Sequence, residues 1–264
     1  MELVEEQGTC ISRACRVMCI ERSYYHYKNR KDDTEVEEAI RAAAVHNDGF
    51  GKIYQVLRNQ GHKWNRKRVY RIYRKMCYSK RVKLKKRVCR EEPSSLPRPD
   101  RPNVTWSMDF VSDRLECGRK FRVFNVIDDC DRNAIAQDVY LSMPAERVVK
   151  LLEKAVWIHG KPDSIRCDNG PEFISGTFRD WCRGNGIELC YIKPGCPTQN
   201  ALIERFNGSY RRAVLDAYIF RTLGEVREQT EKWMKYYNEE RPHEGIGNMT
   251  PNAYREMLLS AVSD

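Results

Sequence analysis

No apolar run in the sequence approaches the ~20 residues that a helix needs to cross a bilayer. The N-terminus, MELVEEQGTC, also lacks the basic and apolar regions of a secretory signal. We therefore expect no membrane partner and a cytoplasmic location. No CxxC pair occurs among the 11 cysteines, so we expect free, mostly buried thiols in a reducing compartment.

One group of cysteines leaves an alternative open. Cys10, Cys15 and Cys19, together with His26, could form a zinc site. Cys15 and Cys19 also lie one helical turn apart, which suits an ordinary apolar helix face. The sequence favours the second interpretation, because the four residues do not have the spacing of a known zinc motif.

Acidic residues are missing from one part of the chain. Residues 51–90 contain 16 Lys and Arg and no Asp or Glu, and the net charge of +10 comes from the first hundred residues. A solvated helix face normally mixes both signs, so this imbalance indicates a polyanionic partner. Nucleic acid is the expected partner, because no lipid anchor or strong apolar stripe accompanies the charge.

The basic region also has helical spacing. We predict helices within 10–20, from about Glu21, from Asp33 or Thr34, over 51–59, and from about Asn65. A short helix, a turn at Gly61 and a strongly basic helix are typical of a helix-turn-helix. The prediction is a basic helical DNA-binding region over 1–90, whose last helix has an outer face of Arg66, Lys67, Arg68, Arg71, Arg74 and Lys75. An ordinary helical bundle with a charged exterior is the alternative.

Four prolines in 91–103 disfavour both helix and central strand, so we predict a linker there. The hydrophobic period changes after it, and 104–264 forms the second region. Five segments have strand character: 104–113, 119–129, 133–141, 162–168 and 187–192. The segments 144–159, 171–186, 199–219 and 222–240 have helical character. Three antiparallel strands followed by alternating helix and strand indicate an α/β fold with a mixed five-stranded sheet.

Three acids fall at informative places in this second region. Asp109 lies in the middle of the first strand, Asp168 ends the fourth strand, and Glu204 lies on a long helix. A carboxylate in a central strand is costly to bury unless something pairs with it. Oxygen ligands favour hard cations such as Mg²⁺ or Mn²⁺, and two such ions can catalyse phosphoryl transfer. The alternative is that Asp109 pairs with a lysine and Glu204 is a solvated acid.

Other acids could be mistaken for ligands. Asp113 shares a strand face with Asp109, while Asp128 and Asp129 end the second strand. Asp168 itself could simply open a turn and cap the following helix. Glu172, near the start of that helix, is expected to interact favourably with the helix dipole.

Several segments together resemble the integrase core of insertion-sequence transposases: WSMDF, IRCDNGPEF and KPGCPTQNALIERFNGSYR. More narrowly, they resemble OrfB, the second reading frame of the insertion-sequence-three family. The 35 residues between Asp168 and Glu204 match that family's D,D(35)E pattern, and Arg211 matches its basic residue seven positions after the glutamate. The tail YYNEERPHEGIGNMTP resembles the family's closing segment, so the resemblance covers essentially the whole chain.

The resemblance implies a ribonuclease-H-like integrase core, preceded by a small all-helical basic domain, that cuts and joins DNA strands. Asp109, Asp168 and Glu204 would be the catalytic residues and would hold two Mg²⁺ ions, for which Mn²⁺ can substitute. The implied partners are the element ends, the target DNA and further copies of the chain bound to DNA, in a bacterial cytoplasm and its nucleoid. Contacts to DNA near the scissile phosphate are implied for Lys193, Gln199, Asn200, Arg205 and Arg211.

The chain also departs from the family. Relatives often act as a fusion with an upstream OrfA portion that carries another helix-turn-helix and a leucine zipper, and no long heptad run occurs in this sequence. A DNA-binding regulator with a silent core and a nuclease without strand transfer therefore remain alternatives. The segment Arg241-Pro242-His243 resembles a family motif, but the sequence gives it no role.

Overall fold

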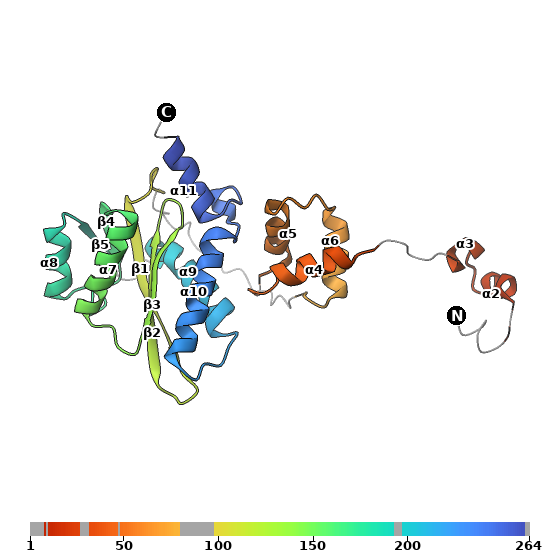
Figure 1. Cartoon of the computed structure of the whole chain (residues 1–264), viewed down its shortest axis with the longest axis horizontal. Coiled ribbons are helices and arrows are strands. Elements are labelled where there is room, and N and C mark those ends of the chain that lie inside the picture. The colour runs from red at the N-terminus through yellow and green to blue at the C-terminus, as the bar shows by residue number, and fades with distance from the viewer. Residues whose placement is uncertain are drawn as a thin grey trace.

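The computed structural model of the chain describes residues 8, 10–26, 32–46, 48–79, 98–192 and 197–261. These residues form a helical N-terminal part and a larger α/β core (Figure 1). Two short helices, α2 (Ile11–Val17) and α3 (Arg22–Tyr25), lie apart from both. Within the described ranges, no helix is long and apolar enough to span a membrane.

Three helices form a compact module next to the core: α4 (Thr34–Ala43), α5 (Phe50–Asn59) and α6 (Arg66–Lys75). Their apolar faces meet in one cluster that includes Val36, Ile40, Ile53, Leu57, Val69 and Ile72. The side chain of Asn65 accepts a hydrogen bond from the backbone N–H of Lys67 at 2.8 Å, which caps α6 where the sequence predicts its start. We call α4–α6 the helical module.

The core contains one mixed sheet of five strands: β1 (Thr105–Arg114), β2 (Lys120–Asp128), β3 (Ala134–Tyr140), β4 (Ser164–Cys167) and β5 (Glu188–Tyr191). Their order is β3-β2-β1-β4-β5. The first three strands are antiparallel, and β4 and β5 run parallel to β1. This arrangement confirms the predicted mixed five-stranded sheet and makes β1 its central strand.

Helices cover both faces of the sheet (Figure 1). Helices α7 (Ala145–His159) and α8 (Gly176–Gly184) pack on one face, and α9 (Ala201–Tyr210) and α10 (Leu223–Glu239) pack on the other. Each face has its own apolar cluster, one built around Phe124 and Phe178 and the other around Phe206 and Trp233. Helix α7 ends at Gly160, whose φ of 87° suits glycine.

Two predicted helices have different limits in the structure. The predicted helix 199–219 consists of a 3₁₀ turn (Pro197–Asn200), α9, and a π-helical turn (Arg211–Leu215) that ends it four residues early. The predicted helix 171–186 begins only at Gly176, because Ser175 caps it by accepting the Phe178 N–H at 3.3 Å. The chain closes with a 3₁₀ turn (Glu244–Ile246) and α11 (Pro251–Ser260).

The predicted linker 91–103 lies partly outside the described residues. Its described end packs on the core, since Arg98 Nε donates to the carbonyl of Cys130 at 2.7 Å. The indole of Trp106 donates to the side chain of Asn103 at 3.1 Å and anchors the entry to β1.

The zinc alternative finds no support in the structure. Cys15 is buried, whereas Cys10 and Cys19 are exposed, and these cysteines and His26 form no metal-binding group among the described residues. Burial of Cys15 agrees with the interpretation of an apolar helix face.

Candidate active site

Asp109 lies in the middle of β1, where its carboxylate is mostly shielded from water. Its Oδ1 accepts the backbone N–H of Phe110 at 2.7 Å, and its Oδ2 accepts the side-chain amide of Asn207 at 2.8 Å. Both partners are neutral, so they orient the carboxylate without cancelling its charge. The alternative that Asp109 pairs with a lysine is not what the structure shows.

Asp168 follows directly after β4, the strand beside β1. Ser107 pairs with Arg166 in the parallel ladder, so the same register, continued two residues further, sets Asp168 beside Asp109. Asp168 Oδ1 accepts the N–H of Gly170 at 3.0 Å, which confirms that it opens a turn. The turn brings the Gly170 backbone so close that an added Cβ would lie 3.0 Å from that same oxygen. Glycine therefore lets the chain curl tightly around an exposed carboxylate.

Glu204 projects from the first turn of α9, which packs against β1 and β2. Its side chain is exposed. Asn207 stands three residues further along and hydrogen-bonds Asp109, so the face of α9 that carries Glu204 also faces β1. The two strands and this helix therefore direct the three acids toward one region of the core.

The electrostatics of Asp109 indicate that its carboxylate feels the charges of both Asp168 and Glu204. Burial, with a further contribution from the negative charges of Asp168 and Glu204, raises the pKa of Asp109 to about 6. In the described part of the chain, none of the three acids forms an ion pair with Lys or Arg. Among the residues that the structure describes, the site is thus a concentration of negative charge without an ion-paired cation.

These donors suit a divalent metal ion. All three are carboxylates, which Mg²⁺ and Mn²⁺ prefer, and a cation would relieve the repulsion that raises the pKa of Asp109. In the described residues, no three acidic, histidine or cysteine side chains yet stand close enough together to hold a metal ion. Exposed Asp168 and Glu204 have room to rotate, whereas Asp109 is held in place.

Two asparagines support the site, and the sequence analysis missed both. Asn125 lies opposite Asp109 in the β1–β2 ladder, and its amide donates to Asn207 Oδ1 at 2.7 Å. Asn207 in turn donates to Asp109, so a chain of two amides fixes the carboxylate. The available signal was the three-residue spacing between Glu204 and Asn207, which places both on one helix face.

Known protein families match the core and the helical N-terminal part of the chain separately. Profiles described as an integrase core domain match residues 99–197 and 185–251, and one described as an HTH-like domain matches residues 31–87. The uncharacterized 31.7 kDa protein of insertion element IS407 from Burkholderia multivorans is 35% identical over 246 residues, which are 92% of this chain and 89% of that protein. The chain belongs to the OrfB-type transposases of the insertion-sequence-three family.

Two further similarities extend this result. A transposase of insertion sequence element IS904 from Lactococcus lactis is 26% identical over 251 residues, which are 88% of this chain and 98% of that protein. A chain of the simian T-cell lymphotropic virus intasome, solved in complex with PP2A regulatory subunit B56 gamma, matches with a TM-score of 0.55. That match has 16% identity and covers 82% of this chain and 74% of the other. The transposase therefore has the predicted ribonuclease-H-like integrase fold.

Several other acids of the transposase core, including three that are buried, are paired with arginines. Arg255 on α11 contacts the fully buried Asp128 at 3.0 Å and Asp131 at 2.6 Å. Arg166 contacts Asp129 at 2.5 Å, and the guanidinium of Arg122 pairs with Glu172. Glu172 precedes α8 by four residues, so an ion pair replaces the helix-dipole interaction that we predicted for it. These acids stabilise the fold and have no free charge for a metal ion.

The DNA contacts predicted near the triad lie in different settings. Lys193 falls outside the described residues. Asn200 is 5% exposed at the start of α9, Gln199 is half-buried, and Arg205 is exposed. Arg211 Nη2 donates to the Ser112 carbonyl at 2.7 Å, which holds this arginine against the end of β1. The roles of these residues in DNA binding stay predictions.

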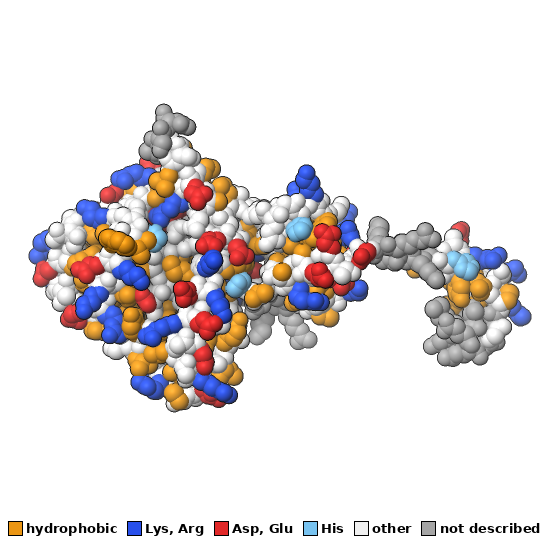
Figure 2. All heavy atoms as spheres, in the orientation of Figure 1, with side chains coloured by type: hydrophobic (Ala, Val, Ile, Leu, Met, Phe, Trp, Pro, Cys, Tyr) orange, Lys and Arg blue, Asp and Glu red, His pale blue; other side chains and the backbone are white. Residues whose placement is uncertain are grey.

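Much of the positive charge predicted on α6 is balanced within the helical module. Arg68 and Arg71 contact Asp33 at 2.9 and 2.8 Å, and Lys75 contacts Glu37 at 3.1 Å. Figure 2 shows acidic and basic side chains mixed over this face of the module. Residues 51–90 contain no acid of their own, so the acidic partners of α6 are supplied by the N-terminal end of α4. Three of the predicted DNA-contact residues form no ion pair in the described part of the chain: Arg66, Lys67 and Arg74. The guanidinium carbon of Arg66 lies 5.9 Å from the centroid of the Phe50 ring.

Proposed function

We propose that Asp109, Asp168 and Glu204 hold two Mg²⁺ ions and that this site cuts insertion-element ends and joins them to other DNA. The observation that supports this most is the negative charge of the three acids, none of which forms an ion pair with an arginine or lysine of the described chain. The buried acids Asp128, Asp129 and Asp131, by contrast, each have an arginine partner. A cluster of unbalanced charge is expensive in a fold unless a ligand uses it.

The residues of the chain contribute position and protonation state. With a pKa of about 6, Asp109 is mainly ionised at neutral pH and is ready to accept a cation. The amides of Asn125 and Asn207 fix its orientation. Divalent ions bound by the triad would stabilise charge on the attacking and leaving oxygens of a phosphodiester. In the first step a water oxygen forms the new P–O bond and a 3′ oxygen leaves as a hydroxyl. In the second step that 3′-OH forms a P–O bond to another phosphodiester, whose own 3′ oxygen leaves and takes up the proton.

We propose a division of labour along the chain. Region 1–90 binds DNA, 91–103 connects it to the core, and 104–264 cuts and joins strands. The HTH-like match over 31–87 supports the first assignment. Lys67 and Arg74, together with Arg66, are the best placed for phosphate contacts, since Asp33 already occupies Arg68 and Arg71. An upstream OrfA portion would add further DNA binding, and several copies would act together on DNA.

The test is a cutting assay with labelled element-end DNA and Mg²⁺. Wild-type protein should nick the DNA and yield joined products, and Glu204→Gln should do neither while it still binds DNA. Asp180→Asn on the exposed surface of α8 is the matched control and should behave as wild type.

Other outcomes would support the alternatives. Binding without any metal-dependent nicking by the wild-type chain would favour a regulator with a silent core. Nicking without joined product would favour a nuclease, or a requirement for the OrfA portion. Nicking that persists in Glu204→Gln would refute the assignment of the triad.

A further inference from the structure

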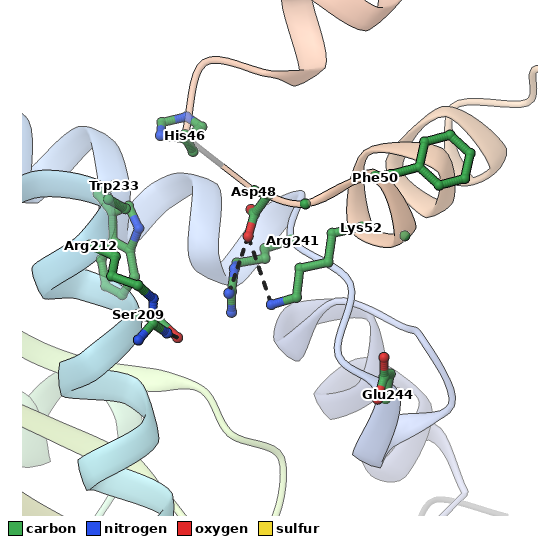
Figure 3. Close-up of a pocket in the computed structure, with 12 residues that line it drawn as sticks. His46, Asp48, Phe50, Lys52, Ser209, Arg212, Trp233, Arg241 and Glu244 are labelled. Carbon is green, nitrogen blue, oxygen red and sulfur yellow. Dashed lines mark hydrogen bonds and ion pairs between the residues drawn. The ribbon is translucent and has the colours of Figure 1, made fainter. Parts of the chain in front are cut away.

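A cavity of about 550 Å³ lies between the helical module and the core, on the side of α9 away from Asp109. It continues into a second cavity of about 320 Å³, and Lys52, Ser209, Arg212 and Arg241 line both. Figure 3 shows Ser209 and Arg212 on one side of the smaller cavity and Asp48, Lys52 and Arg241 on the other. The helical module and the core therefore build this site together.

The lining of the larger cavity is strongly positive. It contains five cations against the single acid Glu244: Lys52, Arg132, Arg205, Arg212 and Arg241. Asp48 contacts Arg241 at 3.3 Å and Lys52 at 3.8 Å. Within the described ranges, Arg132, Arg205 and Arg212 have no carboxylate partner at all.

Two buried polar atoms at this cavity also lack partners. Arg132 Nε and His243 Nε2 form no hydrogen bond with any described residue, and His243 is only 7% exposed. Arg132 Nε always carries a proton, and a buried donor without a partner is costly, so a bound acceptor would be expected to satisfy it. Gly245 makes the placement of Arg132 possible, because any Cβ at that position would collide with the guanidinium.

The excess of positive charge contributes to lowered pKa values for two titratable groups at the cavity. Burial and the nearby charge of Arg241 lower the pKa of Lys52 to about 8, although Asp48 and Glu244 oppose the shift. Burial and the charges of Arg241, Lys52 and Arg132 lower the pKa of His243 to about 3, against a hydrogen bond to the backbone of Tyr237. An anion in the cavity would reverse both effects.

We propose that this cavity binds phosphate groups of the DNA backbone and so holds a strand between the helical module and the core. The proposal rests on the proposed function and adds a binding site to it. Guanidinium groups bind phosphate through paired N–H donors, so the four arginines among the lining residues suit this ligand. Arg205, Ser209 and Arg212 follow one face at helical spacing. They span about 10 Å along the axis, which equals the rise of about three nucleotides of one DNA strand.

The site gives the segment Arg241-Pro242-His243 a role. Arg241 donates a hydrogen bond to Asp48, just before α5, and so connects the core to the helical module. His243 is one of the residues that line the cavity. The same segment that fixes the module to the core therefore shapes the phosphate site. DNA bound by α6 would meet the core beside α9, the helix that also carries Glu204.

The salt dependence of binding to a labelled DNA duplex tests this proposal. The affinity of a protein for DNA falls with salt by a slope of about 0.9 for each phosphate contact. Arg205→Gln/Arg212→Gln should lower that slope by about 2. Arg205→Lys/Arg212→Lys keeps both charges and should keep most of the slope, which separates lost contacts from a damaged fold. Arg179→Gln, at an exposed position on α8, is the control and should leave the slope unchanged.

Two further arms separate this proposal from its alternatives. Pyrophosphate should compete with DNA for the wild type. If it protects the wild type against thermal unfolding but the double Gln variant retains the full salt slope for DNA, the cavity binds free phosphates and the proposal is wrong. Glu204→Gln should keep the wild-type slope while it loses nicking. An unchanged slope in the double Gln variant, with nicking intact in the wild type, would overturn the cavity site and leave the proposed function standing.

Discussion

Asp109→Asn should make the metal-free transposase more stable at pH 8, although it removes a residue that we propose to be catalytic. Because burial and two neighbouring acids raise the pKa of Asp109 to about 6, ionised Asp109 destabilises the folded state. A shift of about two units corresponds to about 3 kcal/mol. Asparagine has one acceptor oxygen, so it loses one of the two hydrogen bonds that Asp109 accepts, at about 1 kcal/mol. The expected net gain is about 2 kcal/mol.

The gain should depend on pH in a definite direction. Since the folded pKa is raised, the folded state binds more protons than the unfolded state between the ordinary aspartate pKa and about 6. Wild-type stability therefore falls as pH rises through this window, whereas the Asn variant does not share this loss. Urea unfolding in the presence of a chelator, at several pH values, should show the advantage of Asp109→Asn at pH 8 shrinking below pH 6 and vanishing near pH 4.

Magnesium should reverse the order of stability. A ligand at a hundred times its Kd adds about 2.7 kcal/mol to the state that binds it, and only the wild type keeps the complete triad. Asp113→Asn, four residues along β1, should respond to Mg²⁺ as the wild type does. If Asp109→Asn is less stable than wild type without metal at pH 8, the electrostatic reasoning is wrong. If Mg²⁺ stabilises both proteins equally, the metal assignment is wrong.

Three other substitutions give expected outcomes. Arg255→Ala leaves two buried aspartates unpaired, so urea unfolding should show a loss of about 3–5 kcal/mol, against less than about 1 kcal/mol for Arg183→Ala in an exposed pair. Asn207→Leu removes a donor to the catalytic β1 carboxylate and should slow nicking about 10–100-fold with DNA binding unchanged. Tyr236→Phe removes a 2.7 Å hydrogen bond to Asp48. It should speed hydrogen exchange around residue 48 about tenfold, without shifting exchange in the sheet.

The sheet could be predicted because its signals are local. Strand alternation and the stop at Gly160 lie within a few residues of what they determine. The end of the α9 segment depends instead on distant contacts. Arg211 bonds the Ser112 carbonyl near the end of β1, and the backbone there adopts a π-helical turn. No sequence pattern within 199–219 indicates that contact, so the helix was predicted four residues too long.

The proposed triad stays a prediction, which joins a chemical oddity to a spacing. A carboxylate at Asp109 contradicts its apolar neighbours, and such contradictions mark functional sites. The supporting amides could not be predicted in the same way. Asn125 in a strand and Asn207 in a helix each have ordinary structural explanations. Only their hydrogen bonds show that both residues act together to orient Asp109. The pairing of Asp33 with the basic helix α6 was missed for the same reason, since 35 residues separate Asp33 from Arg68.

Two groups of three acids in the same core show how charge compensation distinguishes structure from function. Asp128 and Asp131 share Arg255, and Asp129 pairs with Arg166, so arginines fixed in the fold offset the cost of burying this group. The acids that we propose to be catalytic have only amide donors and one another in the described structure. We therefore expect a cation supplied from outside to bind to the second group and not to the first. On the opposite side of α9, the arginines without carboxylate partners present the complementary case, in which the missing partner is an anion.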